Sequence, residues 1–508
     1  MATRRVSFRV GCMTIEPVPE DVEDPTRLAH AYNDIAYVSY PNFASHPDHL
    51  ASVATLLGLD VAPVATARVL ELACGDGTNL LPAAAALPRA TFVGVDFAAR
   101  PLEVARRMTG DLGLTNVRLL HLDLRELPAD LGSFDYIIAH GLYSWIPADV
   151  RARVLPIIAR HLAPQGVAFV SYNTFPGCYA RRAVWEMLKY HARAISDPSA
   201  RLAAARALIA VVSAPLAGED DIQAALREEV RLVGKGSDAV LAHDDMSEPN
   251  DPVYFHEFMA DASRSGLAFL AEARLGAMAS ARLAPEVRQA LAPLDRLERE
   301  QYLDFIHFRR YRESLLCHAG ALSRFVVQPP RALGMHVLPS LTLRRAMASP
   351  DTTPTADPQV TAIIQILMAR WPRSVSVAEI ADWRERVLPA GAGSTRRPIE
   401  FVLAELFLAD LLDLRTAPAT ITAVPGERPE VFAPSRWISR ERDVVPTLYH
   451  EPLRLNDPNV RRIVGLLDGT RTRDDLIRAV GGPLAGPDGI AILETILKKL
   501  AAGAVIVN

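Results

Sequence analysis

Cysteine is scarce in this sequence of 508 residues, which contains only Cys12, Cys74, Cys178 and Cys317. The four lie far apart and none belongs to a CxxC pair, so the spacing of a disulfide framework or a structural zinc site is absent. We therefore expect no metal site. So few cysteines suit a reducing compartment, and we expect the protein to be cytoplasmic.

Long apolar runs and a charge surplus are also missing. The longest apolar stretch, around residues 207–218, ends at Glu219 and Asp220, so we expect a buried helix there and no membrane insertion. No apolar segment follows the amino-terminal arginines before Pro17, which argues against a secretory signal. The net charge of −4 and a pI near 6.4 provide no electrostatic footprint for nucleic acid.

From residue 68 onward, short apolar runs alternate with helical segments. The runs are ARVLELA, TFVGVDF, VRLLHLDL, FDYIIAHG and GVAFVSYN. Such alternation is typical of βαβ units and of a parallel sheet that is buried on both faces. We therefore predict an α/β fold with a doubly wound sheet, whose first part occupies residues 29–177. The length leaves room for about three domains in all.

Composition divides the remainder of the chain. Residues 1–28 are rich in proline and acid, and we expect them to be mobile. Residues 178–250 are helical in pattern, and we interpret them as an insertion that acts as a lid or in dimerisation. Residues 251–325 return to the sheet, where YRESLLCHA could form a late edge strand, antiparallel to its neighbour.

The carboxyl-terminal part begins with a proline-rich stretch, ASPDTTPTADPQV, which predicts a linker at residues 326–359. Residues 360–508 show a helix-turn-helix pattern and predict a winged-helix-like α+β domain. That domain carries 19 Lys and Arg against 18 Asp and Glu. Binding to DNA phosphates requires a basic surplus, so contact with a protein is favoured. We expect removal of this part to leave ligand binding by the sheet intact.

The strongest local signal is VLELACGDGTN at residues 69–79, where a strand passes through a turn of small residues into a helix. Small residues at Ala73, Gly75 and Gly77 let the backbone approach a ligand closely, and the helix start presents free N–H groups. The spacing is AxGxG after an acid, Glu71, and differs from the GxGxxG of dinucleotide enzymes. A tight turn without a ligand is the alternative.

Two further acids follow the next two predicted strands. Asp96 ends TFVGVD, where a carboxylate can accept hydrogen bonds from both hydroxyls of a ribose. Asp123 ends the third strand, in HLD. Each acid alone could be a helix cap, but three acids at successive strand ends favour a ligand site at one edge of the sheet.

The motif at residues 69–79 resembles motif I of class I S-adenosylmethionine-dependent methyltransferases. The resemblance implies that Glu71 lies near the methionine ammonium group and that Asp123 and the Leu124 backbone lie near the adenine. Many such enzymes have glycine where this chain has Ala73. The predicted cofactor-binding residues are Tyr40, Glu71, Ala73, Cys74, Gly75, Gly77, Asn79, Asp96, Phe97, Asp123, Leu124 and His140.

An aromatic-rich segment at residues 32–47 precedes the first strand. In methyltransferases this position often forms a flap over the cofactor, and an aromatic face stabilises a sulfonium cation by about 0.5–2 kcal/mol. We expect Tyr37 or Tyr40 to have this role. The alternative is a surface staple for the helix that begins near Asp48.

The next two strand ends should face the transferred methyl group. They contain HGLYSW at residues 140–145 and SYNTFPG at residues 171–177, which mix aromatic and polar side chains with glycine. An acceptor channel is one interpretation, and packing of Tyr143 and Trp145 beneath the helical insertion is the other. A core histidine is equally consistent with His140. The residues that we expect at the reaction centre are His140, Tyr143, Trp145 and Tyr172.

Longer segments resemble one particular group of methyltransferases. They are YPNFASHPDHLASVATLLGL, RVLELACGDGTNLLPAAAALP, FDYIIAHGLYSWIP, GVAFVSYNTFPG and EREQYLDFIHFRRYRESLLCH. This set is similar to bacterial methyltransferases with a methyltransferase regulatory domain, a group that includes rickettsial protein lysine methyltransferases. The similarity spans about residues 30–320 and is weaker beyond.

That resemblance implies a seven-stranded methyltransferase sheet, S-adenosylmethionine as cofactor with S-adenosylhomocysteine as product, and a homodimer. It also implies N-methylation of a protein or peptide side chain, with lysine favoured. Two alternatives stay open. One is a methyltransferase for a small molecule or a ribosomally made peptide, and the other is a non-catalytic scaffold that binds the cofactor.

Overall fold

The computed structural model describes residues 39–247, 249–279, 283–321, 325–348, 357–388, 396–484 and 486–508. The predicted mobile segment at residues 1–28 and Tyr37 of the predicted flap lie outside these ranges. In the part described, no helix combines the length and the apolar character needed to cross a bilayer.

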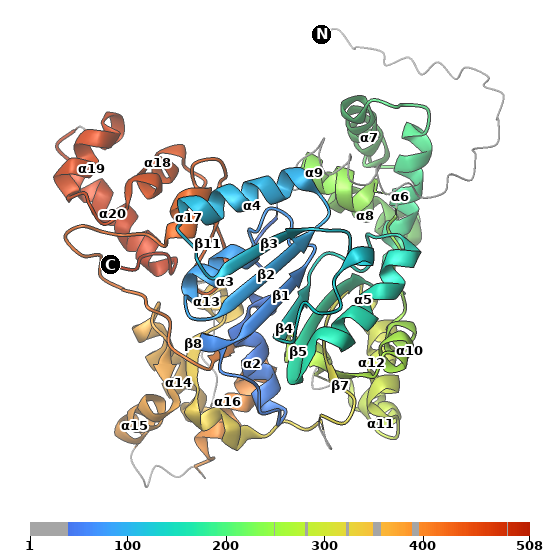
Figure 1. Ribbon diagram of the computed structural model, residues 1–508, viewed down its shortest axis with the longest axis horizontal. Coiled ribbons are helices and arrows are strands. Elements are labelled where there is room, and N and C mark those ends of the chain that lie inside the picture. Colours follow the sequence, from blue (N-terminus) through green and yellow to red (C-terminus); the bar gives the residue numbers. More distant parts are fainter. Residues whose placement is uncertain are drawn as a thin grey trace.

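A seven-stranded sheet forms the centre of the molecule (Figure 1). Its strand order is β3-β2-β1-β4-β5-β7-β6. The strands are β1 (Arg68–Leu72), β2 (Thr91–Asp96), β3 (Val117–His121), β4 (Phe134–Ala139), β5 (Leu162–Asn173), β6 (Leu267–Glu272) and β7 (Tyr311–His318). Strands β1 to β5 run parallel, whereas β7 is antiparallel to both β5 and β6. The doubly wound sheet is confirmed.

One prediction about this sheet was wrong in position. YRESLLCHA forms β7, which is antiparallel as expected but pairs with β5 on one side and β6 on the other. The edge strand is therefore β6. An inner strand must be buried on both faces, and Leu315, Leu316 and Cys317 are all fully buried.

Helices cover both faces because the strands present apolar side chains in both directions. Val69 belongs to one core with α2, whereas Leu70 and Leu72 belong to the other core with α5 and α10. The covering helices are α2 (Pro47–Leu56), α3 (Leu80–Ala86), α4 (Ala99–Asp111), α5 (Ala148–His161), α10 (Phe255–Arg264) and α12 (Arg296–His307), and α11 (Pro285–Leu291) packs against α12.

The segment predicted as a helical insertion consists of helices with a small core of their own. It contains α6 (Cys178–Ala192), α7 (Pro198–Val212), α8 (Asp221–Gly234), α9 (Asp238–Val240) and the π-helix η4 (Leu241–Asp245). Figure 1 shows these helices and the carboxyl-terminal helices α18 to α20 on opposite sides of the sheet.

The carboxyl-terminal part forms two units. The first has a three-stranded sheet in the order β10-β8-β9 with four helices, and the second has four helices with the pair β11 and β12. The first contains β8 (His336–Pro339), α13 (Leu341–Met347), α14 (Pro358–Arg370), β9 (Val375–Ser376), α15 (Val377–Val387), α16 (Ile399–Leu408) and β10 (Leu412–Arg415). The second contains α17 (Ala433–Ile438), β11 (Val444–Pro446), β12 (Pro452–Arg454), α18 (Pro458–Leu466), α19 (Arg473–Val480) and α20 (Gly489–Ala502).

The predicted linker at residues 326–359 needs correction. Strand β8 lies within it and is the central strand of the three-stranded sheet, with Val337 and Leu338 fully buried. Its partners β9 and β10 are distant in sequence, so local composition could not reveal the strand. The proline-rich residues 349–356 lie outside the described ranges.

Both carboxyl-terminal units pack against the central sheet and its helices. Val337 and Phe407 of the first unit share a core with Leu50 of α2. Leu497 of the second unit shares a core with Leu81 of α3, which begins directly after the glycine turn. The carboxyl-terminal part is therefore joined to the sheet by apolar contact, and its own side chains reach the ligand edge.

Candidate functional site

The loop after β1 has an unusual backbone. Ala73, Gly75 and Gly77 have φ angles of 59°, 55° and 76°, a region that is free of strain only for glycine. A Cβ at Gly77 would come within 2.7 Å of Leu81 Cδ1, so glycine lets the loop pack against α3. Ala73 holds the same kind of conformation with a methyl group, at a cost of about 1–2 kcal/mol.

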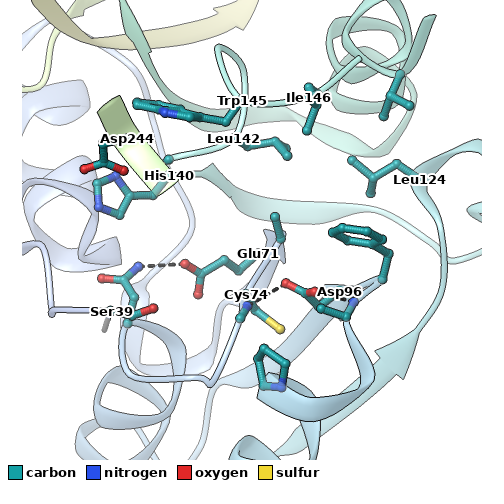
Figure 2. Close-up of a pocket in the computed structure, with 18 of the residues that line it drawn as sticks. Ser39, Glu71, Cys74, Asp96, Leu124, His140, Leu142, Trp145, Ile146 and Asp244 are labelled. Atoms are coloured by element: carbon teal, nitrogen blue, oxygen red, sulfur yellow. Dashed lines mark hydrogen bonds between the residues drawn. The ribbon is translucent and has the colours of Figure 1, made fainter. Parts of the chain in front are cut away.

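A cavity of about 480 Å³ opens beside this loop, at the carboxyl ends of the parallel strands (Figure 2). Ligands of open α/β sheets bind at this edge. The predicted site residues that border it are Tyr40, Glu71, Ala73, Cys74, Gly75, Asn79, Asp96, Phe97, Asp123, Leu124, His140 and Trp145. The cavity lining does not include Gly77, Tyr143 or Tyr172.

Asp96 connects the end of β2 to the glycine turn. Its Oδ2 accepts a hydrogen bond of 2.7 Å from Gly75 N, and its Oδ1 accepts one of 2.8 Å from Ala98 N. Burial raises the pKa of Asp96, and these two hydrogen bonds oppose the rise. Each carboxylate oxygen has a second lone pair, so Asp96 can still accept hydroxyl groups from a ligand.

Asp123 follows β3 and is the N-cap of a short 3-10 helix. It accepts from Arg125 N at 2.8 Å, and its carboxylate forms an ion pair with the Arg125 guanidinium at 2.7 Å. These contacts with Arg125 lower the pKa of Asp123, so the group is ionised. Both side chains border the cavity at the end that also contains Leu124.

Glu71 is the most deeply buried acid of the three, at 2% exposure. Its Oε1 accepts a hydrogen bond of 2.8 Å from Asn79 Nδ2, whereas its Oε2 has no hydrogen-bond partner among the described residues. Burial raises the pKa of Glu71 to about 8, and the Asn79 bond only partly opposes this rise. A cation bound in the cavity would stabilise the ionised form.

Asn79 borders the cavity, but its amide group is occupied by protein partners. Its Oδ1 accepts from Asn42 N at 2.9 Å and from His450 Nε2 at 2.9 Å, while its Nδ2 donates to Glu71. The residue therefore orients Glu71. It also connects the site to the carboxyl-terminal part, because His450 lies between β11 and β12.

A second link to the carboxyl-terminal part holds the glycine turn itself. Arg442 Nη2 lies 2.5 Å from Asp76 Oδ2, and Arg442 Nη1 donates to Thr78 Oγ1 at 3.1 Å. Asp76 is only 5% exposed, and it also accepts from Thr78 N. Sequence reasoning missed Arg442 and His450, because nothing in the local sequence ties them to residues more than 350 positions away.

Tyr143 and Tyr172 do not reach the cavity, and this part of the prediction needs correction. Tyr172 stacks on Phe258 with ring centroids 4.2 Å apart, and its hydroxyl pairs with Ser314 Oγ at 3.1 Å. Tyr143 meets the same Phe258 edge-on at 5.2 Å. Side chains alternate along a strand, so Tyr172 faces α10 while its neighbour Asn173 borders the cavity.

His140 and Trp145 mark the far end of the cavity from Leu124 (Figure 2). His140 Nδ1 lies 3.1 Å from Ser171 Oγ, which also accepts from Gly141 N at 2.9 Å. Burial lowers the pKa of His140, so its ring is neutral near pH 7. His140 thus has one feature of a core histidine, because its ring pairs with Ser171, but the ring also borders the cavity.

Several residues at this far end were not predicted. They come from β5, from α6 and η4 of the helical insertion, and from residues 310–311 at the start of β7, and they are Asn173, Cys178, Arg181, Trp185, Asp244, Arg310 and Tyr311. No short motif contains them, because four separate segments supply them. The one available signal was the acid pair Asp244 and Asp245 after an apolar stretch.

Metal-ligating side chains do not gather into a group of three or more anywhere in the part of the chain that the structure describes. Cys74, Cys178 and Cys317 are buried free thiols. Burial raises the pKa of all three.

The strand order, the glycine turn after β1 and the three acids at the carboxyl ends of β1, β2 and β3 are typical of the class I S-adenosylmethionine-dependent methyltransferase fold. Two family models match the sequence. The model described as "Methyltransferase domain" matches residues 69–166, and the model described as "Predicted methyltransferase regulatory domain" matches residues 237–318. The chain belongs to the methyltransferase family that carries this regulatory domain, as the resemblance had implied.

Rickettsial proteins are among its relatives. An uncharacterized protein of Rickettsia prowazekii is 37% identical over 289 residues, which are 56% of this chain and 52% of that protein. The chain thus spans about half the length of that relative. A second uncharacterized protein of the same organism is 32% identical over 235 residues, which are 46% of this chain and 94% of that protein.

The solved structure of PKMT2 from Rickettsia typhi in complex with AdoHcy has the same fold. Its TM-score is 0.82 at 23% sequence identity, and the superposition covers 93% of this chain and 100% of that one. The shared fold extends through the carboxyl-terminal part as well as the sheet.

Proposed function

We propose that this protein transfers a methyl group from S-adenosylmethionine to the side-chain amine of a lysine in a protein or peptide. The observation that carries the proposal is that Glu71, Asp96 and Asp123 all border one cavity beside the glycine turn. Family membership supports the cofactor, and the resemblance to rickettsial protein lysine methyltransferases supports the acceptor.

The buried acid Glu71 provides the test of whether these residues fit the cofactor. Its unpartnered Oε2 needs a donor, and the methionine ammonium group is such a donor. Asp96 would hold the ribose hydroxyls, and Asp123 with Leu124 would hold the adenine. Tyr40 borders the same cavity and would lie near the sulfonium cation.

The cofactor supplies a methyl group that is activated by a positively charged sulfur. The task of this chain is then to orient the acceptor, because an in-line displacement needs the reacting atoms about 3 Å apart and aligned. The lysine amine must also arrive uncharged. Apolar walls such as Trp145 and Leu142 lower the pKa of a buried amine, which favours its neutral form.

Further parts of the proposal concern assembly and location. We infer that the helical insertion at residues 178–250 acts as a lid or in dimerisation, and that the protein works as a cytoplasmic homodimer. The buried free thiols suit a reducing compartment. The carboxyl-terminal part would contribute to substrate recognition, since Asp410, Asp413 and Glu451 line a second cavity that shares Tyr40 and His140 with the first.

Transfer of label from methyl-labelled S-adenosylmethionine in a cell lysate tests the function. After incubation with the purified protein, mass spectrometry should find the label on lysine Nζ of one or a few proteins. Label on small molecules alone would favour the natural-product alternative. Cofactor binding in calorimetry without any label transfer would favour the non-catalytic scaffold. The Asp96→Ala variant is the control for transfer by other proteins of the lysate.

A further inference from the structure

The acceptor end of the cavity, which we define by His140, Trp145, Asp244 and Tyr311, contains one carboxylate without a partner. Asp244 lies in the π-helix η4 and borders the cavity. Within the described part of the chain its carboxylate forms no hydrogen bond and no ion pair. Figure 2 shows it at the same end as His140 and Trp145, away from Asp96 and Leu124.

The cations around Asp244 are bound to other acids. Arg181 donates from Nε to Asp245 Oδ1 at 2.8 Å, and its Nη2 lies at the same distance from that oxygen. Arg310 forms an ion pair of 2.7 Å with Glu229. Asp245 is further fixed by Trp185 Nε1 at 2.8 Å. The charge of the adjacent acid, Asp245, is therefore balanced by Arg181, whereas the Asp244 carboxylate has no such partner among the described residues and borders the cavity.

The other titratable groups around Asp244 provide no positive charge. Burial, and next the charge of Glu313, raise the pKa of Tyr311 on β7, and the charge of Asp244 adds a smaller rise, so the phenol is neutral. His140 is neutral because burial lowers its pKa. Burial, and next the charge of Asp245, raise the pKa of Asp244 to about 7, while Arg181 opposes the rise.

An unpaired carboxylate in such surroundings is costly to the folded protein. Groups of this kind cluster at functional sites, where a ligand completes them. A cavity with one unmatched negative charge and apolar walls favours a cation that has an alkyl stem. The side chain of lysine has this form, and a carboxylate or phosphate acceptor would be repelled.

We propose that Asp244 receives the acceptor amine, an inference that rests on the proposed function. Asp244 binds the lysine ammonium group and takes one proton from it, which leaves a neutral amine. The nitrogen lone pair then forms a bond to the methyl carbon while the carbon–sulfur bond breaks and its electron pair goes to sulfur. The product amine carries the positive charge, and the proton on Asp244 passes to solvent.

The Asp244→Asn variant tests this role, because it keeps the shape and removes the charge. The matched control is Asp382→Asn, which changes an exposed carboxylate on the remote helix α15. The binding probe is n-pentylamine, a mimic of the lysine stem, with 1-pentanol as its neutral counterpart. Both are titrated by NMR into protein that is saturated with S-adenosylhomocysteine.

We expect Asp244→Asn to bind S-adenosylhomocysteine within twofold of wild type and to bind n-pentylamine at least tenfold more weakly, with pentanol unchanged. On poly-L-lysine, its methylation rate at pH 7 should fall by roughly 100-fold, the usual effect of losing a general base. That rate should then rise about tenfold per pH unit, because the amine must lose its proton to solvent before it binds.

Two results would overturn the role of Asp244: amine binding equal to wild type in Asp244→Asn, or a wild type that binds amine no better than alcohol. Asp244→Ala and the thermal midpoint of each variant show whether a loss comes from unfolding. Failure of the proposed function looks different. Wild type would then fail to bind S-adenosylhomocysteine, or would methylate no lysine, whatever the amine binding shows.

Discussion

The two ends of the cavity are built in different ways. At the cofactor end, the acids Glu71, Asp96 and Asp123 lie at the carboxyl ends of three consecutive strands, so one short part of the chain supplies them all. At the acceptor end, β4, β5, α6, η4 and β7 each contribute. The first arrangement is fixed by the topology of the sheet alone, whereas the second depends on how distant segments pack.

The two ends of the cavity therefore differ in how easily their residues can change. A cofactor common to a whole class needs one conserved geometry, which consecutive strand ends provide. An acceptor site assembled from separate segments can change one segment at a time. The regulatory-domain model begins at residue 237, just before η4, so that domain supplies Asp244 to the acceptor end.

Asp96→Ala should have the largest effect on cofactor affinity, a property of the cofactor end alone. Loss of the charged acceptors for Gly75 N, Ala98 N and the ribose should weaken cofactor binding by about 1–3 kcal/mol, roughly 5- to 150-fold. Isothermal titration calorimetry with S-adenosylhomocysteine measures it. Asp130→Ala, an exposed acid nearby, is the control. Unchanged affinity in Asp96→Ala would contradict the site.

The next effect is a pH dependence that belongs to the cofactor end. Glu71 has a raised pKa of about 8, so below that pH the free protein is protonated there. Binding of an ammonium group favours the ionised form, so a proton must leave. Cofactor affinity should therefore rise with pH, by about tenfold per unit up to pH 8.

Titrations between pH 6 and pH 8 in buffers of different ionisation enthalpy measure both the affinity and the proton release. Glu71→Gln should bind the cofactor weakly and with little pH dependence. Asp244→Asn should retain the wild-type dependence, since that group lies at the acceptor end. A wild-type affinity that is flat across this range would show that Glu71 does not meet the ammonium group.

The sequence predicts the cofactor end of the cavity better than the acceptor end. The five parallel strands, the glycine turn and the three acids could all be predicted, because strand ends and small-residue turns are local signals. At the carboxyl end of β5 the prediction failed by one residue. Tyr172 faces α10 and Asn173 faces the cavity, and a composition of aromatic and polar residues does not define this register.

Contacts made between distant segments could not be predicted. Strand β8 has partners at β9 and β10 and was therefore interpreted as part of a linker. The sequence does not show that Asp244 lacks a cationic partner in the described part of the chain, because this depends on Arg181 binding Asp245 instead. The expectation that the carboxyl-terminal part is dispensable for ligand binding stays a prediction. The contacts of Arg442 with the glycine turn and of His450 with Asn79 argue against it, and local sequence could not reveal them.

The smallest effect that we predict concerns this link between the carboxyl-terminal part and the cofactor end. Arg442→Gln removes the partner of Asp76, which lies near Glu71 and Asp96 and adds to their raised pKa values. The turn should loosen, and cofactor affinity should fall by roughly three- to tenfold, about 0.7–1.4 kcal/mol. Arg440→Gln, an exposed neighbour, is the control.

A double-mutant cycle with Asp76→Asn isolates the link from general destabilisation. If the ion pair holds the turn, Asp76→Asn combined with Arg442→Gln should bind the cofactor better than the sum of the two single losses predicts, because no buried charge is left unpaired. Strictly additive losses would mean that each residue acts separately. In that case the apolar packing of Leu497 against Leu81 and the hydrogen bond between His450 and Asn79 would join the carboxyl-terminal part to the cofactor end.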